Sequence, residues 1–195
     1  MDFRTELDIN QNISPNFPQI SHKTPILSIG SCFADMIGAK LAFYKFKIIS
    51  NPFGIIFNPI SITKLLKLSL ENSSKSLSND NLGCFFDENF IKNQENIWYH
   101  YDFHSDLYGN TKQEIQQKIN IKIQQTQGFF RENIPNNLAE DIAKNTPKTL
   151  ILTFGTAFVY VQNDNKQVVA NCHKVAQKNF NKKMLSVDEI VTDFE

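Results

Sequence analysis

The residue with the clearest potential for covalent chemistry is Cys32, which lies between a short apolar run and the start of a helical pattern. The apolar run at 26–29 is closed by Gly30, and Cys32 follows two residues later. At such a turn, the first helix amides and the helix dipole lower the pKa of a thiol and stabilise negative charge. Amides of the same turn can bind a developing oxyanion, which contributes about 3–4 kcal/mol per donor. The spacing therefore makes Cys32 a candidate nucleophile, and a small buried packing residue is the alternative interpretation.

Four histidines are candidates for the proton acceptor that such a reaction needs: His22, His100, His104 and His173. His22 belongs to a polar N-terminal stretch and is expected to be exposed. His100 and His104 are four residues apart on an expected strand, so they would share one face, which suits packing more often than a metal. No third ligand of suitable spacing accompanies them, and no metal site is predicted.

His173 is the best of these candidates for a base, because it follows an expected strand end, where loop residues reach a cleft. The amide side chain of Asn171 could orient the imidazole ring or hydrogen-bond a substrate. A hydrogen-bonded turn at 171–173 that only holds a hairpin to the domain is an equal alternative.

The three cysteines, Cys32, Cys84 and Cys172, are odd in number and widely spaced, which indicates neither a disulfide framework nor a CxxC metal pair. Cys84 has no charged partner nearby and is expected to be a packing residue. The N-terminus lacks the basic start and apolar run of a signal peptide, and no apolar run approaches the roughly 20 residues of a membrane span. A cytoplasmic protein without a membrane span is expected.

Composition restricts the class of partner. The chain has 195 residues, of which 41% are hydrophobic, and this is enough for one domain with its own core. Twenty Lys and Arg residues balance 20 Asp and Glu residues. Because the net charge is zero, no long-range field favours nucleic acid or anionic lipid, so electrostatics indicates no particular partner. No nucleic-acid partner and no cofactor are expected.

The first half of the chain has a βαβα pattern. After an extended lead-in at 1–24, the expected elements are a strand at 26–29, a helix from residue 33, a strand at 46–49, a Pro/Gly loop at 51–59 and a helix at 60–70. The residues expected to face inward on the first helix are Phe33, Ile37, Leu41 and Tyr44. Those on the second are Ile62, Leu65, Leu66 and Leu70.

The second half mixes strands and helices. The expected elements are a polar surface loop at 71–82, a β-rich region at 85–103, a long helix after Thr111, a short helix at 137–144, a strand buried on both faces at 149–154, a hairpin with strands at 157–161 and 167–170, and a final helix. Capping boxes of Thr111 with Glu114 and of Ser186 with Glu189 mark the starts of the long and final helices. Ile115, Ile119, Ile123 and Phe130 are expected to face inward on the long helix, and Ile190 and Val191 on the last.

Five segments together carry a resemblance to a known family. They are GSCFA at 30–34, NPFGIIFNP at 51–59, YDFHS at 101–105, LTFGTAFVY at 152–160 and VANCHK at 169–174. In order and spacing they resemble the GSCFA family, over a domain at 25–195. That family is similar to the SGNH, or GDSL-like, hydrolases. The resemblance implies an α/β fold, namely a three-layer α/β/α, flavodoxin-like domain with a mainly parallel sheet, of which this chain would be the N-terminal part, incomplete at its C-terminus.

The same resemblance implies roles for the first motifs. The Gly-Asp-Ser block of SGNH enzymes falls on 30–32, so Cys32 takes the place of the serine nucleophile and Ser31 is a weaker second candidate. Gly54 takes the place of the glycine that donates to the oxyanion. Gly155 and Thr156 match the start of a Gly-x-Asn-Asp block, whose Asn and Asp are replaced here by alanine and phenylalanine.

The remaining family positions imply substrate contacts by Asn58, His104, Thr156 and Asn171. The Asp-x-x-His that supplies the base in SGNH enzymes has no counterpart, so the family's chain is expected to continue beyond Glu195 and His173 is the substitute base. The implied function is hydrolysis or transfer of an acyl group, with a small-molecule ester or an acylated glycan or lipid as substrate. The alternatives are a non-catalytic binding module on the same scaffold and an inactive truncated fragment.

Overall fold

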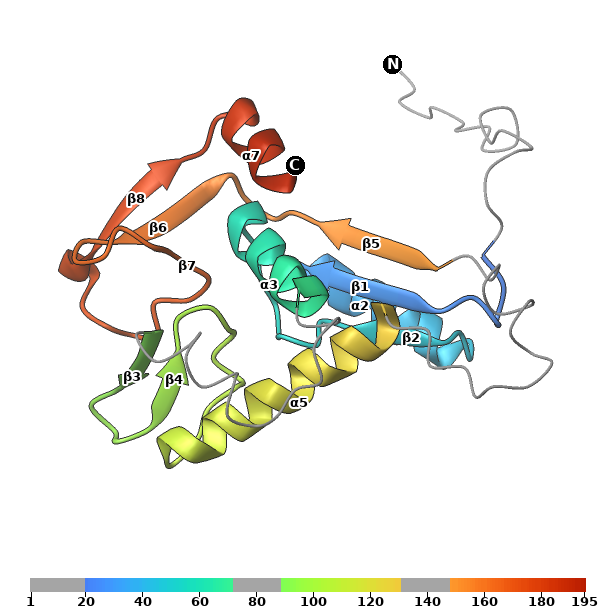
Figure 1. Cartoon of the computed structure of the whole chain (residues 1–195), viewed down its shortest axis with the longest axis horizontal. Coiled ribbons are helices and arrows are strands. Elements are labelled where there is room, and N and C mark those ends of the chain that lie inside the picture. Colours follow the sequence, from blue (N-terminus) through green and yellow to red (C-terminus); the bar gives the residue numbers. More distant parts are fainter. Residues whose placement is uncertain (1–19, 72–88, 131–147) are drawn as a thin grey trace, which may run out of the picture.

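The computed structural model describes residues 20–71, 89–130 and 148–195 (Figure 1). Most of the expected lead-in and polar loop, the short helix expected at 137–144, and Cys84 lie outside these ranges. The described part is a mixed α/β structure, as the βαβα pattern predicted.

The main sheet is parallel and has three strands in the described part of the chain. Its strands are β1 (Ile26–Gly30), β2 (Ile48–Ser50) and β5 (Thr149–Thr153), in the order β2-β1-β5. A crossover helix, α2 (Cys32–Phe43), joins β1 to β2, as parallel neighbours require. All five residues of β1 are buried. The expectation that 149–154 is buried on both faces is wrong, because Leu150 is 43% and Phe154 is 48% exposed.

Helix α2 packs on the sheet through small residues, which corrects the expected inward face. Phe33 and Tyr44 are 57% and 56% exposed, whereas Ala34 and Gly38 are buried. A Cβ atom on Gly38 would lie 2.1 Å from Ser50 Oγ and 2.4 Å from Ser50 Cβ. Apolar spacing misidentified the face because the helix backbone lies too close to β2 to accommodate large side chains.

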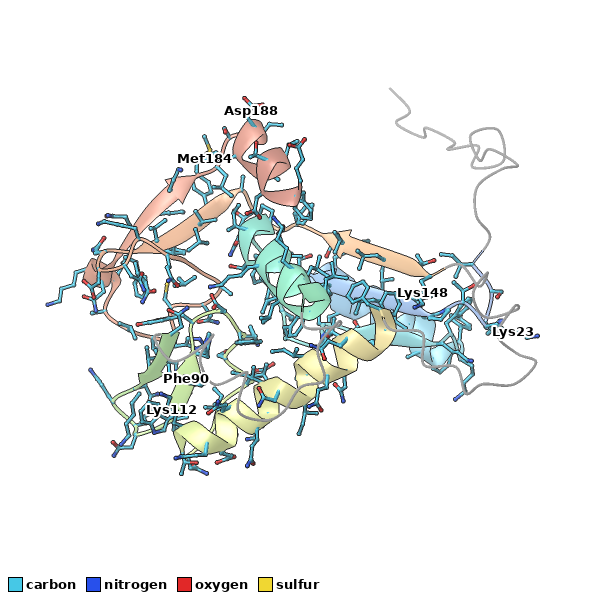
Figure 2. The ribbon with its side chains drawn as sticks, viewed as in Figure 1. Lys23, Phe90, Lys112, Lys148, Met184 and Asp188 are labelled. Carbon is cyan, nitrogen blue, oxygen red and sulfur yellow. The ribbon has the colours of Figure 1, made fainter. Side chains whose placement is uncertain are left out.

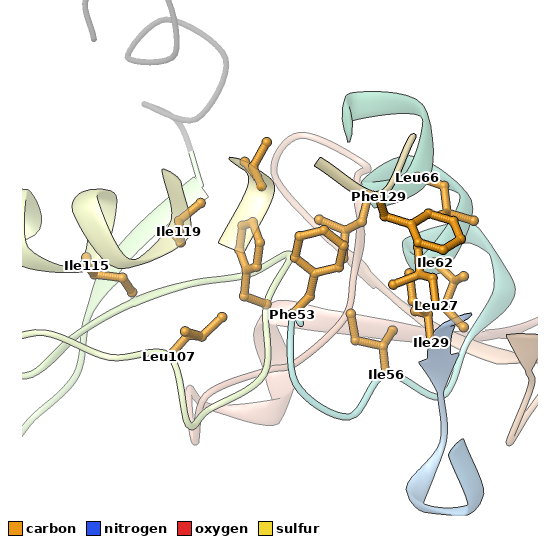
Figure 3. Close-up of a cluster of buried hydrophobic side chains, with 13 residues drawn as sticks. Leu27, Ile29, Phe53, Ile56, Ile62, Leu66, Leu107, Ile115, Ile119 and Phe129 are labelled. Carbon is orange, nitrogen blue, oxygen red and sulfur yellow. The ribbon is translucent and has the colours of Figure 1, made fainter. Parts of the chain in front are cut away.

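Two helices cover the other face of the sheet, α3 (Pro59–Glu71) and α5 (Lys112–Phe130) (Figure 1). The three predicted inward isoleucines of α5 are buried, and Phe130 is partly buried against the same core. Three of the four residues predicted for α3 are buried, and the exception is Leu70, which is 47% exposed. These helices enclose the main core together with Leu27, Ile29 and Phe53 (Figure 3). The Thr111 hydroxyl accepts from the Glu114 amide at 3.1 Å, as the capping signature predicted.

The rest of the described chain forms two small antiparallel sheets and a last helix. Their elements are β3 (Phe90–Lys92) paired with β4 (Trp98–His100), the sheet of β6 (Phe158–Gln162), β7 (Val168–Val169) and β8 (Phe180–Met184), a 3-10 helix η3 (Gln177–Asn179), and α7 (Val187–Phe194). The predicted hairpin of β6 with β7 and the capping box of Ser186 with Glu189 are confirmed. Met184 and Asp188 project outward where β8 leads into α7 (Figure 2), and Val191, expected inward, is 51% exposed.

The close contact of α2 with β2 gives a prediction with an internal control. We expect Gly38→Ala to lower the free energy of unfolding by about 1–3 kcal/mol, because the new methyl group overlaps Ser50. Gly128→Ala on α5 should instead raise it by up to about 1 kcal/mol, since no described atom outside the helix's own backbone lies within 4 Å of the new Cβ and alanine favours the helix. Urea unfolding of both variants measures the two effects. Stabilisation by Gly38→Ala would contradict the packing described here.

Candidate functional site

Three loops meet at the carboxyl edge of the parallel sheet. They are the turn at 30–32 between β1 and α2, the loop at 51–58 between β2 and α3, and the turn at 155–156 after β5. The Ile56 amide donates to the Gly30 carbonyl at 2.9 Å, and the Gly155 amide donates to the Phe57 carbonyl at 2.9 Å. We call these three segments the sheet-edge site, and in open α/β sheets this edge is where ligands bind.

Ser31 and Cys32 have different environments at this site. Ser31 is buried and is the N-cap of α2: its Oγ accepts from the Phe33 amide at 3.3 Å and lies 3.1 Å from Thr153 Oγ1. Cys32 is the first residue of α2, and its side chain is exposed. Of the two nucleophiles suggested by the sequence, only Cys32 is both accessible and free of a capping role.

The first turn of α2 leaves one amide available. The amides of Phe33, Ala34 and Asp35 all bond to Ser31. The Cys32 amide makes no hydrogen bond in the described part of the chain. It therefore remains available to an anion or a developing oxyanion at the N-terminus of this 12-residue helix.

Asn51 holds the turn in place, and sequence reasoning missed it. It is buried, its Oδ1 accepts from the Gly30 amide at 2.8 Å, and its Nδ2 lies 3.5 Å from the Ser31 carbonyl oxygen. Its φ of 39° is in the left-handed region, which asparagine tolerates better than most residues. An asparagine directly after a strand and before a proline was the available signal.

Gly54 lies in the loop at 51–58, where the resemblance expected it. Its φ is +79°, and a Cβ atom there would lie 2.2 Å from His104 Cβ. Its amide donates to the Asn51 carbonyl at 2.8 Å, so in this geometry it is not free to donate to an oxyanion. The close contact with His104 and the positive φ explain why a glycine, and not a residue with a side chain, occupies this position.

The other loop residues at this edge have hydrogen bonds within the protein. The amides of Gly155 and Thr156 both donate to the Phe57 carbonyl, and the Thr156 hydroxyl accepts from the next strand. Asn58 is 5% exposed; its Oδ1 accepts from the Ser61 amide at 2.8 Å as the N-cap of α3, and its Nδ2 donates to the Val169 carbonyl at 3.4 Å. Asn58 therefore joins the start of α3 to the strand that contains Val169.

The four histidines lie in different settings. His104 is partly exposed; its amide donates to the Phe53 carbonyl at 3.2 Å, and its Nδ1 lies 3.1 Å from Asp106 Oδ2. His100 is fully buried beside Asp102, so it does not share an accessible face with His104. His22 is exposed, as expected. Within the described residues no imidazole hydrogen-bonds to Cys32, and no group of three or more His, Cys, Asp or Glu residues is placed to hold a metal.

His173 is part of a hydrogen-bonded turn, which was the second of its two interpretations. It is 3% exposed, its ring stacks on Tyr99 with 4.7 Å between centroids, and its Nε2 lies 2.8 Å from the His100 carbonyl oxygen. Its amide donates to Asn171 Oδ1 at 2.8 Å. Burial, with a smaller contribution from nearby His104, lowers the pKa of His173 to about 4.

This environment predicts a pH-dependent stability. The unfolded His173, with an ordinary pKa of 6.5, binds a proton that the folded residue, with a pKa of about 4, does not. The stability is therefore fully present above about pH 6.5 and falls as the pH drops towards 4, by at most about 3 kcal/mol from this residue. We expect His173→Gln to flatten this slope in urea unfolding between pH 8 and pH 4. An unchanged slope would contradict burial as the cause.

No helix within the described ranges combines the length and apolar character needed to cross a membrane.

Comparisons with known proteins agree with the motifs at the sheet edge. Residues 25–195 match the model of the GSCFA family. Searches of curated proteins and of solved structures found no match. The match covers the sheet-edge site and both small antiparallel sheets. The chain therefore belongs to the GSCFA family.

Proposed function

We propose that this protein transfers or hydrolyses acyl groups, with Cys32 as the nucleophile. The observation that carries the proposal is the position of Cys32: it is exposed at the first residue of α2, and its own amide has no partner in the described chain. The order of Gly30, Ser31 and Cys32 supports an ester substrate, because it parallels the nucleophile block of SGNH hydrolases. A small-molecule ester or an acylated glycan or lipid is the proposed substrate class.

The reaction has two balanced steps. The thiolate of Cys32 attacks the acyl carbon, an S–C bond forms, and the negative charge on the carbonyl oxygen is bound by the Cys32 amide. The C–O bond to the alcohol then breaks, and the alcohol leaves with a proton. Water or a second alcohol attacks the thioester, which releases the acid or the new ester and restores the thiol.

Among the described histidines, we propose His104 as the residue that moves these protons. It is partly exposed, it lies against Gly54 in the loop at 51–58, and its Nδ1 accepts from the Asp106 amide at 3.4 Å and lies 3.1 Å from Asp106 Oδ2. His173 is less suited, because it is buried and already bonded to a backbone carbonyl. A base role for His173 would require the turn at 171–173 to open.

A non-catalytic binding module is the second candidate, and two observations favour it. The resemblance implies that Gly54 and Gly155 lie beside the oxyanion. Their amides, however, donate to backbone carbonyls. No imidazole in the described ranges hydrogen-bonds to Cys32. A ligand could occupy the sheet edge without reacting.

Alkylation with iodoacetamide separates these candidates. An activated Cys32 should lose less of its labelling rate between pH 8 and pH 6 than glutathione labelled in parallel. Cys172 serves as the internal comparison, because burial raises the pKa of its thiol, and it should label at least about tenfold more slowly at pH 7. Peptide mass spectrometry distinguishes the cysteines. If the rate at Cys32 falls in parallel with that of glutathione, the binding module is favoured.

A further inference from the structure

A pocket of about 430 Å³ lies on the sheet of β6, β7 and β8, and its lining residues differ from those of the sheet-edge site. The residues that give it its chemistry are Tyr160, Asn171, Cys172, Gln177 and Phe180. They come from β6, from β8 and from the segment between β7 and β8 (Figure 1). The volume is within the roughly 300–1,000 Å³ typical of small-molecule sites. None of these residues belongs to the sheet-edge site.

The lining combines aromatic side chains with neutral hydrogen-bonding groups. Tyr160 and Phe180 provide aromatic side chains, and the Tyr160 hydroxyl and the carboxamides of Asn171 and Gln177 can both donate and accept. Among the described residues, the lining includes no Lys, Arg, Asp, Glu or His. Such a pocket suits an uncharged ligand that has one apolar face and several groups that both donate and accept.

The segment that forms one wall is held in a defined conformation. The Ala170 and Asn171 amides both donate to the Tyr101 carbonyl, at 2.9 and 3.2 Å. Asn171 Oδ1 accepts from the His173 amide, so the Nδ2 group remains available for a ligand. His173 and Lys174 have φ values of 48° and 61°, two successive non-glycine residues in the left-handed region. Backbone strain of this kind is concentrated at ligand clamps and switch regions.

We propose that this pocket binds a neutral sugar ring. The C–H face of a pyranose packs on an aromatic side chain, and its hydroxyls pair with groups that both donate and accept, which the two carboxamides and the tyrosine hydroxyl provide. A sugar is favoured over a planar heterocycle because the polar residues come from three places in the chain, β6, the turn after β7 and η3, and hydroxyls around a ring can pair with groups from all three. Only the further step, that the sugar belongs to an acylated glycan cleaved at Cys32, rests on the proposed function.

Cys172 provides the test, because its thiol lines the pocket. The full chain is labelled with N-ethylmaleimide in the presence of glucose, galactose, N-acetylglucosamine or adenosine, and peptide mass spectrometry follows Cys172. We expect at least one sugar to slow labelling of Cys172 severalfold in a saturable manner. Exposed Cys32, outside the pocket, should label at an unchanged rate. Protection by adenosine alone, by no compound, or equally at both cysteines would overturn the proposal.

Two surface variants sharpen the test. Gln177→Ala removes one carboxamide from an exposed 3-10 helix and should weaken protection of Cys172 by about threefold to tenfold. Lys178→Ala, which alters the adjacent exposed side chain, should leave protection unchanged. Cys32→Ser should also leave protection of Cys172 unchanged, because Cys32 lies outside the pocket. If no acyl transfer is found but sugars still protect Cys172, the proposed function fails and the sugar site stands. Equal protection in the Gln177 and Lys178 variants would count against the pocket.

Discussion

Cys32→Ala is expected to abolish acyl-enzyme formation from an activated ester such as p-nitrophenyl acetate, with a loss of about a thousandfold or more in acylation rate. The reason is that the attacking sulfur is removed while α2, which begins at this residue, retains its Ser31 cap. Mass spectrometry of the trapped protein measures the acetyl group, and hydroxylamine should release it as expected of a thioester.

Two matched variants define the meaning of that result. Cys172→Ala should retain acylation, because the Cys172 thiol is partly buried and its pKa is raised by burial. Ser31→Ala should cost about 1 kcal/mol of stability through the lost cap while Cys32 still acylates. If acylation persists in Cys32→Ala and disappears in Ser31→Ala, the nucleophile is Ser31 and not Cys32.

Gly54→Ala is expected to lower the free energy of unfolding by about 3 kcal/mol. Roughly 1 kcal/mol comes from placing a side chain at a φ of +79°, and the remainder from the overlap of its Cβ with His104 Cβ. Because the same contact places His104 against the loop at 51–58, the proposed acylation should also slow. Urea unfolding gives the stability, and the ester assay gives the rate.

A double-mutant cycle separates the two contributions. In a His104→Gly background the overlapping atom is absent, so Gly54→Ala should cost only about 1 kcal/mol, and the coupling energy should approach 2 kcal/mol. Additive effects of the two substitutions would mean that the φ angle alone requires the glycine. His104→Gly by itself should also slow acylation if this residue moves the proton.

Local sequence signals predicted much of the fold. The Ser186 and Glu189 capping box, the β6–β7 hairpin and the inward isoleucines of α5 all follow from neighbours within a few residues, and all are present. The strand expected at 149–154 was correct in position and wrong in burial. A run of apolar residues identifies a strand, but the burial of its side chains depends on which other segments pack on each face of the sheet.

The candidate site shows the same division. The motif at 30–34 identified the turn and Cys32, but the hydrogen bond between the hydroxyls of Ser31 and Thr153 joins residues that are 122 positions apart. The bond of Asn51 to Gly30 and the contact of Gly54 with His104 are also contacts between separate segments. No propensity within a short window encodes them.

The sequence by itself therefore determined the family, the strand-turn-helix that presents Cys32, and the inward faces of α3 and α5, because these depend on short-range pattern and capping. Tertiary structure decided which serine or cysteine is accessible, that small residues of α2 face the sheet, and that His173 is buried against Tyr99. The physical reason is that burial and hydrogen-bond partners belong to pairs of distant segments, and each pair is fixed only when the sheet and its loops have assembled.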